Sequence, residues 1–374
     1  MSSDENNKTV NLNIDLFEAC KDQNIDLVKG LIAQGAQASY VSRTDGVWGA
    51  YDQESILHSA IYSLKDEASK IDRENWKDII KILLSNGADP NGRKESYNWK
   101  GTGQSLTAFD LWRSLATKED SGMIKLFLKA GLNPNLSRVK NIHSMRTDGV
   151  IKNSLLHDLT NSGDPEFIIE LLEAGTDVES RATEDIDNER GFREKKSNTA
   201  LHIAASNGDN EICVILLSKG SNIDSIHYFI DSTEDENIKN ENTTDDPRDD
   251  SYKNPWININ VECTALHLAI KNGHYDLAKL FLIAGSDSSI SYKSGDNYIS
   301  TIDLFQEGNK AAIEKEESLK NSLSGNLAIK PLITSMSESC RTKILATLTK
   351  VSNLGWELKT SNLYELFEVL KSSE

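Results

Sequence analysis

The sequence of 374 residues carries 41 basic and 58 acidic side chains, a formal net charge of −17, and 38% of its residues are hydrophobic. Such an acid excess argues against binding to nucleic acids, because contact with the phosphate backbone needs a basic face. It fits a basic protein partner, and it fits equally a protein that the charge simply keeps soluble.

The sequence predicts a cytoplasmic protein that does not enter a membrane. No run approaches the about 18 consecutive apolar residues that span a bilayer, and residues 1–6 lack the basic and apolar regions of a signal peptide. The four cysteines lie far apart without metal-binding or redox spacing, and we predict buried free thiols at Cys20, Cys213, Cys263 and Cys340.

The chain begins with a polar segment, residues 1–12, which is predicted to be flexible. Two apolar stretches follow, at residues 16–20 and 26–36, and we interpret them as a pair of helices. Asp15 and Asp26 are the predicted N-caps of this pair, because their carboxylates can accept bonds from the first free backbone N–H groups.

Similar pairs of apolar stretches recur along the chain. In most of them the first stretch begins near Ser or Thr and the second ends at Gly. The pairs occupy residues 55–91, 105–135, 154–175, 198–220, 263–285 and 299–316. The last pair has a charged second stretch and no Gly ending, and a polar outer face is expected of a terminal unit.

Two copies are especially clear. Residues 198–208 read Asn-Thr-Ala-Leu-His-Ile-Ala-Ala-Ser-Asn-Gly, and residues 263–273 read Cys-Thr-Ala-Leu-His-Leu-Ala-Ile-Lys-Asn-Gly. The sequence resembles ankyrin repeats in these motifs, and the resemblance covers residues 13–317. It implies a curved helical solenoid of stacked units, because one unit cannot bury its apolar face alone. It also implies a concave face that binds another protein.

The units are farther apart than the about 33 residues of a typical ankyrin repeat. Successive equivalent positions are separated by 49, 50, 45, 65 and 36 residues. These positions are Leu57, Leu106, Leu156, Leu201, Leu266 and Ile302. In the three later helix pairs the step from this Leu to the terminal Gly is constant at 19 residues. The extra residues therefore lie where the family has its β-hairpin finger, and we predict five elongated fingers.

The predicted fingers contain most of the candidate partner-binding residues. Aromatic residues on protruding elements are typical binding anchors, but in stacked hairpins they also pair across strands and hold the hairpins together. The candidates are Trp48, Tyr51, Tyr97, Trp99, Phe192, Tyr228, Phe229, Tyr252 and Trp256.

The fifth finger contains an acidic insert at about residues 231–250. Nine acidic residues stand against two basic ones there, and such a composition cannot bury enough apolar surface to order itself. The insert is either a solvated segment or an acidic arm that docks on a basic partner.

Residues 318–374 lack the repeat pattern. Apolar residues recur there at helical spacing, from Ile344 to Val351 and from Leu363 to Leu370. We predict helices that cap the last repeat, with an independent docking module as the alternative.

No pattern of catalytic or ligand-binding residues emerges. The resemblance implies a structural role for the repeated histidines His58, His157, His202 and His267, which bridge backbone groups of the neighbouring turn. Metal-ligand spacing, a dinucleotide fingerprint, a P-loop and a nucleophile elbow are all missing from the sequence. We therefore predict no enzyme, no cofactor and no metal.

The predicted fold class is all-α: an ankyrin-repeat solenoid (residues 13–317) with inserted β-hairpin loops and a C-terminal helical cap (residues 318–374). The predicted function is non-catalytic binding of a protein partner, with a basic partner as the sharper version, by a chain that is a monomer in isolation. Such a module could serve as a scaffold or as a neutralising, immunity-type inhibitor. The alternatives are a secreted bacterial effector that acts on host proteins in the host cytosol, and the targeting arm of an enzyme.

Overall fold

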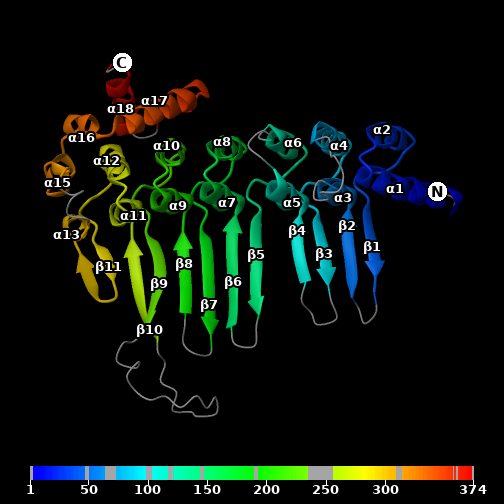
Figure 1. Ribbon diagram of the computed structural model, residues 1–374, viewed down its shortest axis with the longest axis horizontal. Helices are drawn as coiled ribbons and strands as arrows, with labels where there is room; N and C mark the ends of the chain where they lie inside the picture. Colours follow the sequence, from blue (N-terminus) through cyan, green and yellow to red (C-terminus); the bar gives the residue numbers. More distant parts are fainter. Residues whose placement is uncertain are drawn as a thin grey trace, which may run out of the picture. The chain divides into compact units, whose positions relative to one another are not determined.

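The computed structural model describes residues 3–46, 50–63, 73–97, 103–116, 120, 122–143, 147–188, 193–234, 256–308, 314–356, 358 and 361–372. The chain divides into two units, Met1–Pro134 and Asn135–Glu374 (Figure 1). Each unit is described by itself.

The first unit contains helix pairs and a four-stranded antiparallel sheet in the order β1-β2-β3-β4. Its described elements are α1 (Ser3–Lys21), α2 (Ile25–Ala33), β1 (Val41–Asp45), β2 (Tyr51–Ser55), α3 (Ile56–Tyr62), α4 (Arg73–Ser85), β3 (Arg93–Tyr97), β4 (Gly103–Thr107), α5 (Ala108–Leu115) and α6 (Met123–Lys129). The core between α5 and α6 is aromatic, because the rings of Phe109, Trp112 and Phe127 have centroids 5.1 to 5.4 Å apart.

The first helix pair differs from the sequence prediction at its ends. Helix α1 starts at Ser3 and so includes most of the polar segment that we predicted to be flexible. Asp15 consequently lies inside α1 and caps nothing. Helix α2 is capped by Asn24, whose side chain accepts a bond from the backbone of Leu27, while Asp26 lies in the first turn.

The second unit contains the later helix pairs, an eight-stranded antiparallel sheet in the order β12-β11-β10-β9-β8-β7-β6-β5, and the C-terminal helices. The repeat elements are β5 (Ser137–His143), β6 (Thr147–Ser154), α7 (Leu155–Ser162), α8 (Pro165–Glu173), β7 (Ala182–Asn188), β8 (Arg193–Asn198), α9 (Ala200–Asn207), α10 (Asn210–Ser218), β9 (His227–Glu234), β10 (Trp256–Cys263), α11 (Ala265–Lys271), α12 (Tyr275–Ala284), β11 (Tyr292–Ser294), β12 (Asn297–Ile299) and α13 (Thr301–Gln306). The C-terminal helices are α15 (Glu317–Leu323), α16 (Ile329–Ser335), α17 (Glu338–Asn353) and α18 (Ser361–Lys371).

The all-α fold class is wrong, because the fingers of each unit join into one sheet. Within unit 2, strand β6 pairs with β7, β8 with β9, and β10 with β11, so each hairpin also bonds to its neighbour. The pairing of β6 with β7 extends over six residue pairs, from Thr147↔Asn188 to Lys152↔Thr183. The long fingers thus satisfy backbone groups that shorter loops would leave to solvent. The structure is a repeat of helix pairs and hairpins with two β-sheets.

The inner helices, those that directly follow a hairpin, begin in the same way in several repeats. Thr199 and Thr264 each form a reciprocal capping arrangement with the histidine three residues later. Asp110 takes the place of that histidine after Thr107 and keeps the same reciprocal bonds. The change from His to Asp in this repeat therefore preserves the start of the helix.

A second repeating contact links the turns that follow the outer helices, which are the second helices of each pair. In unit 1 the side chain of Asn91 accepts a bond from the backbone of Asn133 (2.8 Å). In unit 2 Asn135 and Asp224 accept equivalent bonds from the backbone of Asp177 (2.9 Å) and Asp287 (3.0 Å). These side chains set the spacing from one repeat to the next by satisfying turn N–H groups.

The C-terminal helices lie along the outer helices of unit 2 (Figure 1). Helix α17 packs against α10, α15 and α16 pack against α12, and α18 packs against both α17 and α12. The fully buried Lys279 of α12 contacts the C-terminal segment by an ion pair to Glu316 (2.7 Å) and by donating to the carbonyl of Ser335 on α16 (2.9 Å). It also pairs with Asp276 of its own helix (3.2 Å). The segment thus reaches back over earlier repeats, beyond the cap on the last repeat that the sequence suggested.

The four cysteines are free and buried, which confirms the prediction from their spacing. Burial raises the pKa of the Cys20, Cys263 and Cys340 thiols to about 12 and raises that of Cys213 as well. In the part of the chain that the structure describes, no helix has the length and apolar character needed to cross a membrane.

Candidate functional site

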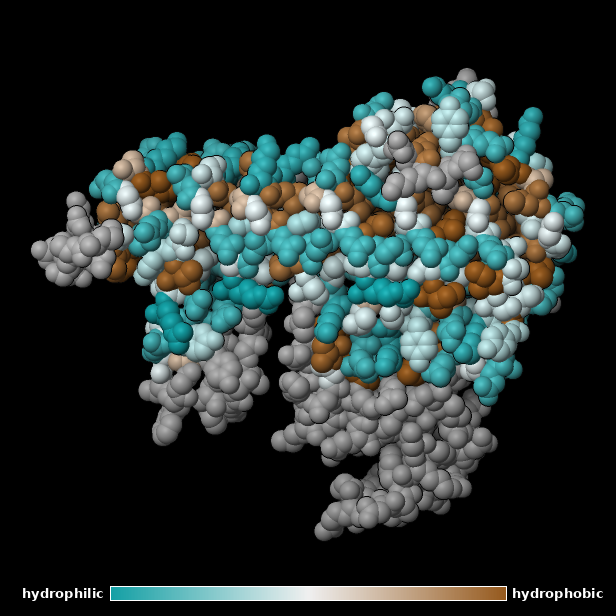
Figure 2. Space-filling view, turned by 180° about the vertical axis from the view of Figure 1, so that it is seen from behind, coloured by the Kyte–Doolittle hydropathy of each residue, from teal (hydrophilic) through white to brown (hydrophobic). Residues whose placement is uncertain are grey.

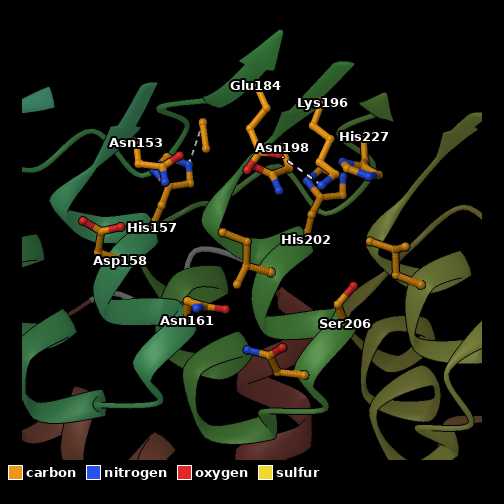
Figure 3. Close-up of a pocket in the computed structure, with 14 residues that line it drawn as sticks. Asn153, His157, Asp158, Asn161, Glu184, Lys196, Asn198, His202, Ser206 and His227 are labelled. Carbon is orange, nitrogen blue, oxygen red and sulfur yellow. Dashed lines mark hydrogen bonds and ion pairs between the residues drawn. The ribbon is translucent and has the colours of Figure 1, made fainter. Parts of the chain in front are cut away.

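A cavity of about 380 Å³ lies in unit 2 where the inner helices meet the roots of the hairpins (Figure 3). We call this side of the unit, formed by α7, α9, α11 and the adjoining surface of β6 to β9, the inner face. Helix α7 contributes Asp158 and Asn161, and helix α9 contributes Ile203 and Ser206. The cavity therefore spans two successive repeats and the hairpins between them.

Two of the histidines at the cavity, His157 and His202, serve the fold, as expected from the sequence. His202 accepts a bond at Nδ1 from the backbone of Thr199 (3.2 Å), and its Nε2 lies 2.8 Å from the carbonyl oxygen of Ser225. His157 accepts at Nε2 from the backbone of Ala182 (3.0 Å). Each ring thus bridges a helix start to the following hairpin.

Burial also removes these rings from acid–base chemistry. It lowers the pKa of His157, and it lowers the pKa of His202 to about 3, with a smaller effect from the neighbouring His227. Because both rings are neutral and held by structural bonds, neither is suited to exchange a proton near neutral pH.

The cavity has more acidic than basic side chains around it. The ammonium of Lys196 on β8 bonds to Glu184 on β7 (3.1 Å) and also to Glu194. Burial opposes the charged form of Lys196, but the two carboxylates outweigh it and raise the pKa of the lysine. Asp158 adds a further carboxylate to the lining. Acidic groups thus outnumber basic ones around the opening.

Two buried polar atoms at the cavity have no hydrogen-bond partner among the described residues. They are Oδ1 of Asn198 and Nδ1 of His227. Both residues line the cavity (Figure 3). Ser197 and Tyr228 form the last residue pair between β8 and β9; Asn198 follows Ser197 and His227 precedes Tyr228, so the two are neighbours at the inner ends of adjacent strands. Buried polar groups are rarely left unpaired, which makes this pair unusual.

The predicted aromatic residues fall into three groups. Three have described side chains: Tyr51 and Tyr228 donate from their hydroxyls to Glu95 (3.0 Å) and Asn260 (3.2 Å), and Phe229 stacks near His227 at 5.0 Å. Tyr97 and Trp256 are described as backbone within β3 and β10. The remaining four lie outside the described residues: Trp48, Trp99, Phe192 and Tyr252.

The described aromatics contact residues of their own sheet or of the helix beside it. The guanidinium of Arg43 lies 4.4 Å from the ring centroid of Tyr51, and the ammonium of Lys271 on α11 lies 5.9 Å from that of Phe229. The first contact lies within one hairpin, and the second joins a hairpin to the helix beside it. A role of these nine residues in binding a partner stays a prediction.

Sequence reasoning missed the polar residues of the cavity. Asp158, Glu184, Lys196 and Asn198 come from separate elements, and each looks like an ordinary polar residue in its own segment. Alternation along the strands places Glu184 and Ala182 on one side of β7, but only the pairing of β7 with β8 brings Glu184 beside Lys196. That pairing could not be read from single segments.

The polar and charged side chains that line the cavity suit recognition of a partner by hydrogen bonds and ion pairs. Within the described residues no group of three or more His, Cys, Asp or Glu side chains is placed to hold a metal ion. Figure 2 shows hydrophilic residues over much of the face that it presents, with hydrophobic residues in patches between them.

Stacked helix pairs with paired hairpins define a repeat protein of the helical solenoid class. Residues 156–293 match the family model of ankyrin repeats in three copies. The chain therefore contains ankyrin repeats within residues 156–293.

The ankyrin-repeat domain of human ASB11 is similar in structure, with a TM-score of 0.41 and 16% sequence identity, over 84% of this chain and 97% of that one. A comparison with curated protein sequences gives no match. Ankyrin repeats generally mediate protein–protein interaction, and the fold is typically non-catalytic.

Proposed function

We propose that this chain is a non-catalytic module that binds a protein partner through the inner face and the hairpins of its repeats. A single observation carries the proposal: in unit 2 the outer helices α10 and α12 are already packed against the C-terminal helices, whereas the inner face carries an open, polar cavity. A partner that binds the repeats of unit 2 therefore has the inner face and the hairpins available to it.

The distribution of charge supports a basic partner. Residues 1–134 contain 16 basic and 19 acidic side chains, and residues 135–374 contain 25 basic and 39 acidic ones. The acid excess is thus concentrated in the unit that carries the cavity. Complementary charge speeds the encounter of two proteins and selects among partners.

The proposal also assigns a role to the chain and to each of its parts. A monomeric cytoplasmic chain of this kind would act as a scaffold or as a neutralising inhibitor that covers a basic protein. Residues 13–317 form its binding part, and residues 318–374 stabilise unit 2 by covering its outer helices. The acidic insert at residues 231–250 is a second point of attraction for a basic partner.

The test is capture of partners from a cell lysate by the full chain carrying an affinity tag. Asn161 and Asn207 are exposed on the inner helices α7 and α9, so the double variant Asn161→Arg/Asn207→Arg should lose the captured partner. Glu173→Arg is the matched control, because it changes the net charge by the same amount at an exposed position of the outer helix α8. Equal loss with both variants, or retention with both, would reject binding through the inner face.

A further inference from the structure

Asn198 and His227 place two unpaired polar atoms side by side at the cavity. The register that pairs Ser197 with Tyr228 puts Asn198 opposite His227 on the adjacent strand. Residues opposite each other in an antiparallel pair point to the same face of the sheet, with Cβ atoms about 4.5–5.5 Å apart. Both residues line the cavity, so one ligand group can reach Oδ1 of Asn198 and Nδ1 of His227 at once.

The ring of His227 is held with Nδ1 as an acceptor. The residue is 7% exposed, and its ring centroid lies 5.4 Å from that of His202 and 5.0 Å from that of Phe229. Its other ring nitrogen bonds to the backbone of Ser197, and burial lowers the pKa of His227 to about 4. The ring is therefore neutral near pH 7, and Nδ1 carries a lone pair that requires an N–H or O–H donor.

The charged groups around the pair cancel. The ammonium of Lys196 bonds to Glu184 (3.1 Å) and also to Glu194. The guanidinium of Arg181 donates to the carbonyl of Ile226 (3.0 Å), the residue directly before the histidine. Two cations and two carboxylates leave no formal net charge among these groups. The two unpaired atoms therefore favour a neutral ligand that brings hydrogen-bond donors.

We propose that the pair binds the side-chain carboxamide of a glutamine or asparagine of the partner protein. The NH₂ group donates one hydrogen to Nδ1 of His227 and the other to Oδ1 of Asn198. Its carbonyl oxygen accepts from Lys196, whose ammonium has three donors and two carboxylate partners among the described residues. Asp158 takes no part, because it lies beyond His157 (Figure 3). The inference rests on the proposed function and deepens it by naming a group that the inner face recognises.

A carboxamide suits the pair better than other groups of a protein partner. A hydroxyl or a backbone N–H has one donor for two acceptors. An arginine or lysine head has enough donors but would bring its charge close to Arg181 and Lys196. The volume of about 380 Å³ is near the lower end of the about 300–1,000 Å³ of ligand pockets, so the cavity holds one side chain rather than a folded element.

Two arrangements without a protein ligand compete with this proposal. If the Asn198 amide turned by 180°, its nitrogen could donate to Nδ1 of His227 and satisfy both residues. One ordered water molecule could also donate to both acceptors. In either case the site has no use for the N–H groups of a carboxamide, and it does not distinguish a carboxamide from an ester of similar shape.

The experiment uses the full chain with methyl-labelled Ile and Leu and ¹⁵N-labelled His at pH 7. The two probes are Nα-acetyl-glutamine methylamide and the γ-methyl ester of Nα-acetyl-glutamate methylamide, which is neutral and has no N–H at its end. The glutamine probe should shift the methyl resonances of Ile203 and Leu268 and the Nδ1 resonance of His227. It should bind about tenfold more tightly than the ester, because it adds hydrogen bonds to buried acceptors.

Two neighbouring variants give the matched comparison. His227→Phe keeps a ring but removes the acceptor, so it should abolish the preference for glutamine. Tyr228→Phe should keep that preference, because Tyr228 points to the other face of β9 and its hydroxyl donates to Asn260 (3.2 Å).

Equal affinity of the two probes, or shifts that leave the Nδ1 resonance of His227 unchanged, would overturn the carboxamide site even if His227→Phe proved unstable. The result is separable from the proposed function. Capture that depends on the inner face, together with no glutamine preference, overturns this inference alone. Capture that does not depend on the inner face overturns the proposed function, and the assignment of the carboxamide to a protein partner fails with it.

Discussion

At the scale of single residues, the repeated histidines are the most informative side chains. Their recurrence at one position predicted a structural role, and the bonds of His202 to Thr199 and Ser225 confirm it. The same role is visible at His267, where Nδ1 accepts from the backbone of Thr264 and Nε2 lies 3.0 Å from the carbonyl oxygen of Ile290. The N-cap of α2 was harder to predict. Asn and Asp both suit an N-cap, and the structure places Asn24 rather than Asp26 at that position.

The buried histidines predict how stability depends on pH. Burial lowers the folded pKa of His202 to about 3 and that of His267 to about 4, below the ordinary value of about 6.5 in the unfolded chain. Between pH 6.5 and about 4 the unfolded state therefore binds more protons, so stability is highest above pH 6.5 and falls on acidification. Each such histidine contributes a loss of about 1.5 kcal/mol between pH 6.5 and 5.

This dependence can be measured by denaturant unfolding at a series of pH values. The variant His202→Gln should be less stable than the parent at pH 7.5 but should lose less stability than the parent on acidification, because one titrating group is gone. An identical pH dependence in parent and variant would show that His202 does not contribute as described.

At the scale of elements, the spacing of the repeats predicted extra residues in the fingers, and it could not show how strands of different repeats associate. Each hairpin follows from local alternation and turns, whereas the pairing of β6 with β7 depends on the distance between repeats. A missed signal lies in α10 and α12. Residues 212–218 and 277–284 are buried all round and mostly apolar, and such a helix requires cover on its outer side as well. That cover is the C-terminal segment.

The joint between α9 and α12 gives a prediction at this scale. Gly208 ends α9 with a φ of +75°, and a Cβ there would lie 2.6 Å from Nδ1 of His274, whose Nε2 lies 3.0 Å from the carbonyl oxygen of Ser206. Gly163 ends α7 with a φ of +69° and open space around it. Gly163→Ala should cost about 1–2 kcal/mol of backbone strain, and Gly208→Ala should cost about 1 kcal/mol more, because the bond of His274 is also lost.

Thermal or denaturant unfolding of the two variants measures the difference. The pair is matched, since both glycines end an inner helix in the left-handed conformation. Equal destabilisation would mean that His274 moves aside without cost and does not join the two repeats.

At the scale of the whole molecule, the composition gives the net negative charge but not where the acidic residues gather in the fold. The cavity brings together Asp158, Glu184 and Lys196 from α7, β7 and β8, so the site exists only after the repeats stack and the hairpins pair. The sequence could indicate a binding module and a basic partner. It could not indicate the place where charge and unpaired acceptors meet, because that place belongs to no single repeat.

The acid excess predicts the rate at which a basic partner binds. If charge steers the encounter, the association rate constant should fall on the order of tenfold between 50 and 500 mM salt, while the dissociation rate changes little. Surface-based or stopped-flow kinetics with the captured partner would measure both rates. An association rate that is independent of salt would contradict steering and leave the acidity as a matter of solubility.

The most direct test of binding through the inner face is hydrogen–deuterium exchange of the full chain, alone and with the captured partner. We predict added protection in the inner helices α7, α9 and α11 and in the strands β6 to β9, with the exchange of α8, α10, α12 and the C-terminal helices unchanged. Protection confined to the outer helices or to residues 318–374 would contradict the account, because the partner would then bind the side that the chain already covers.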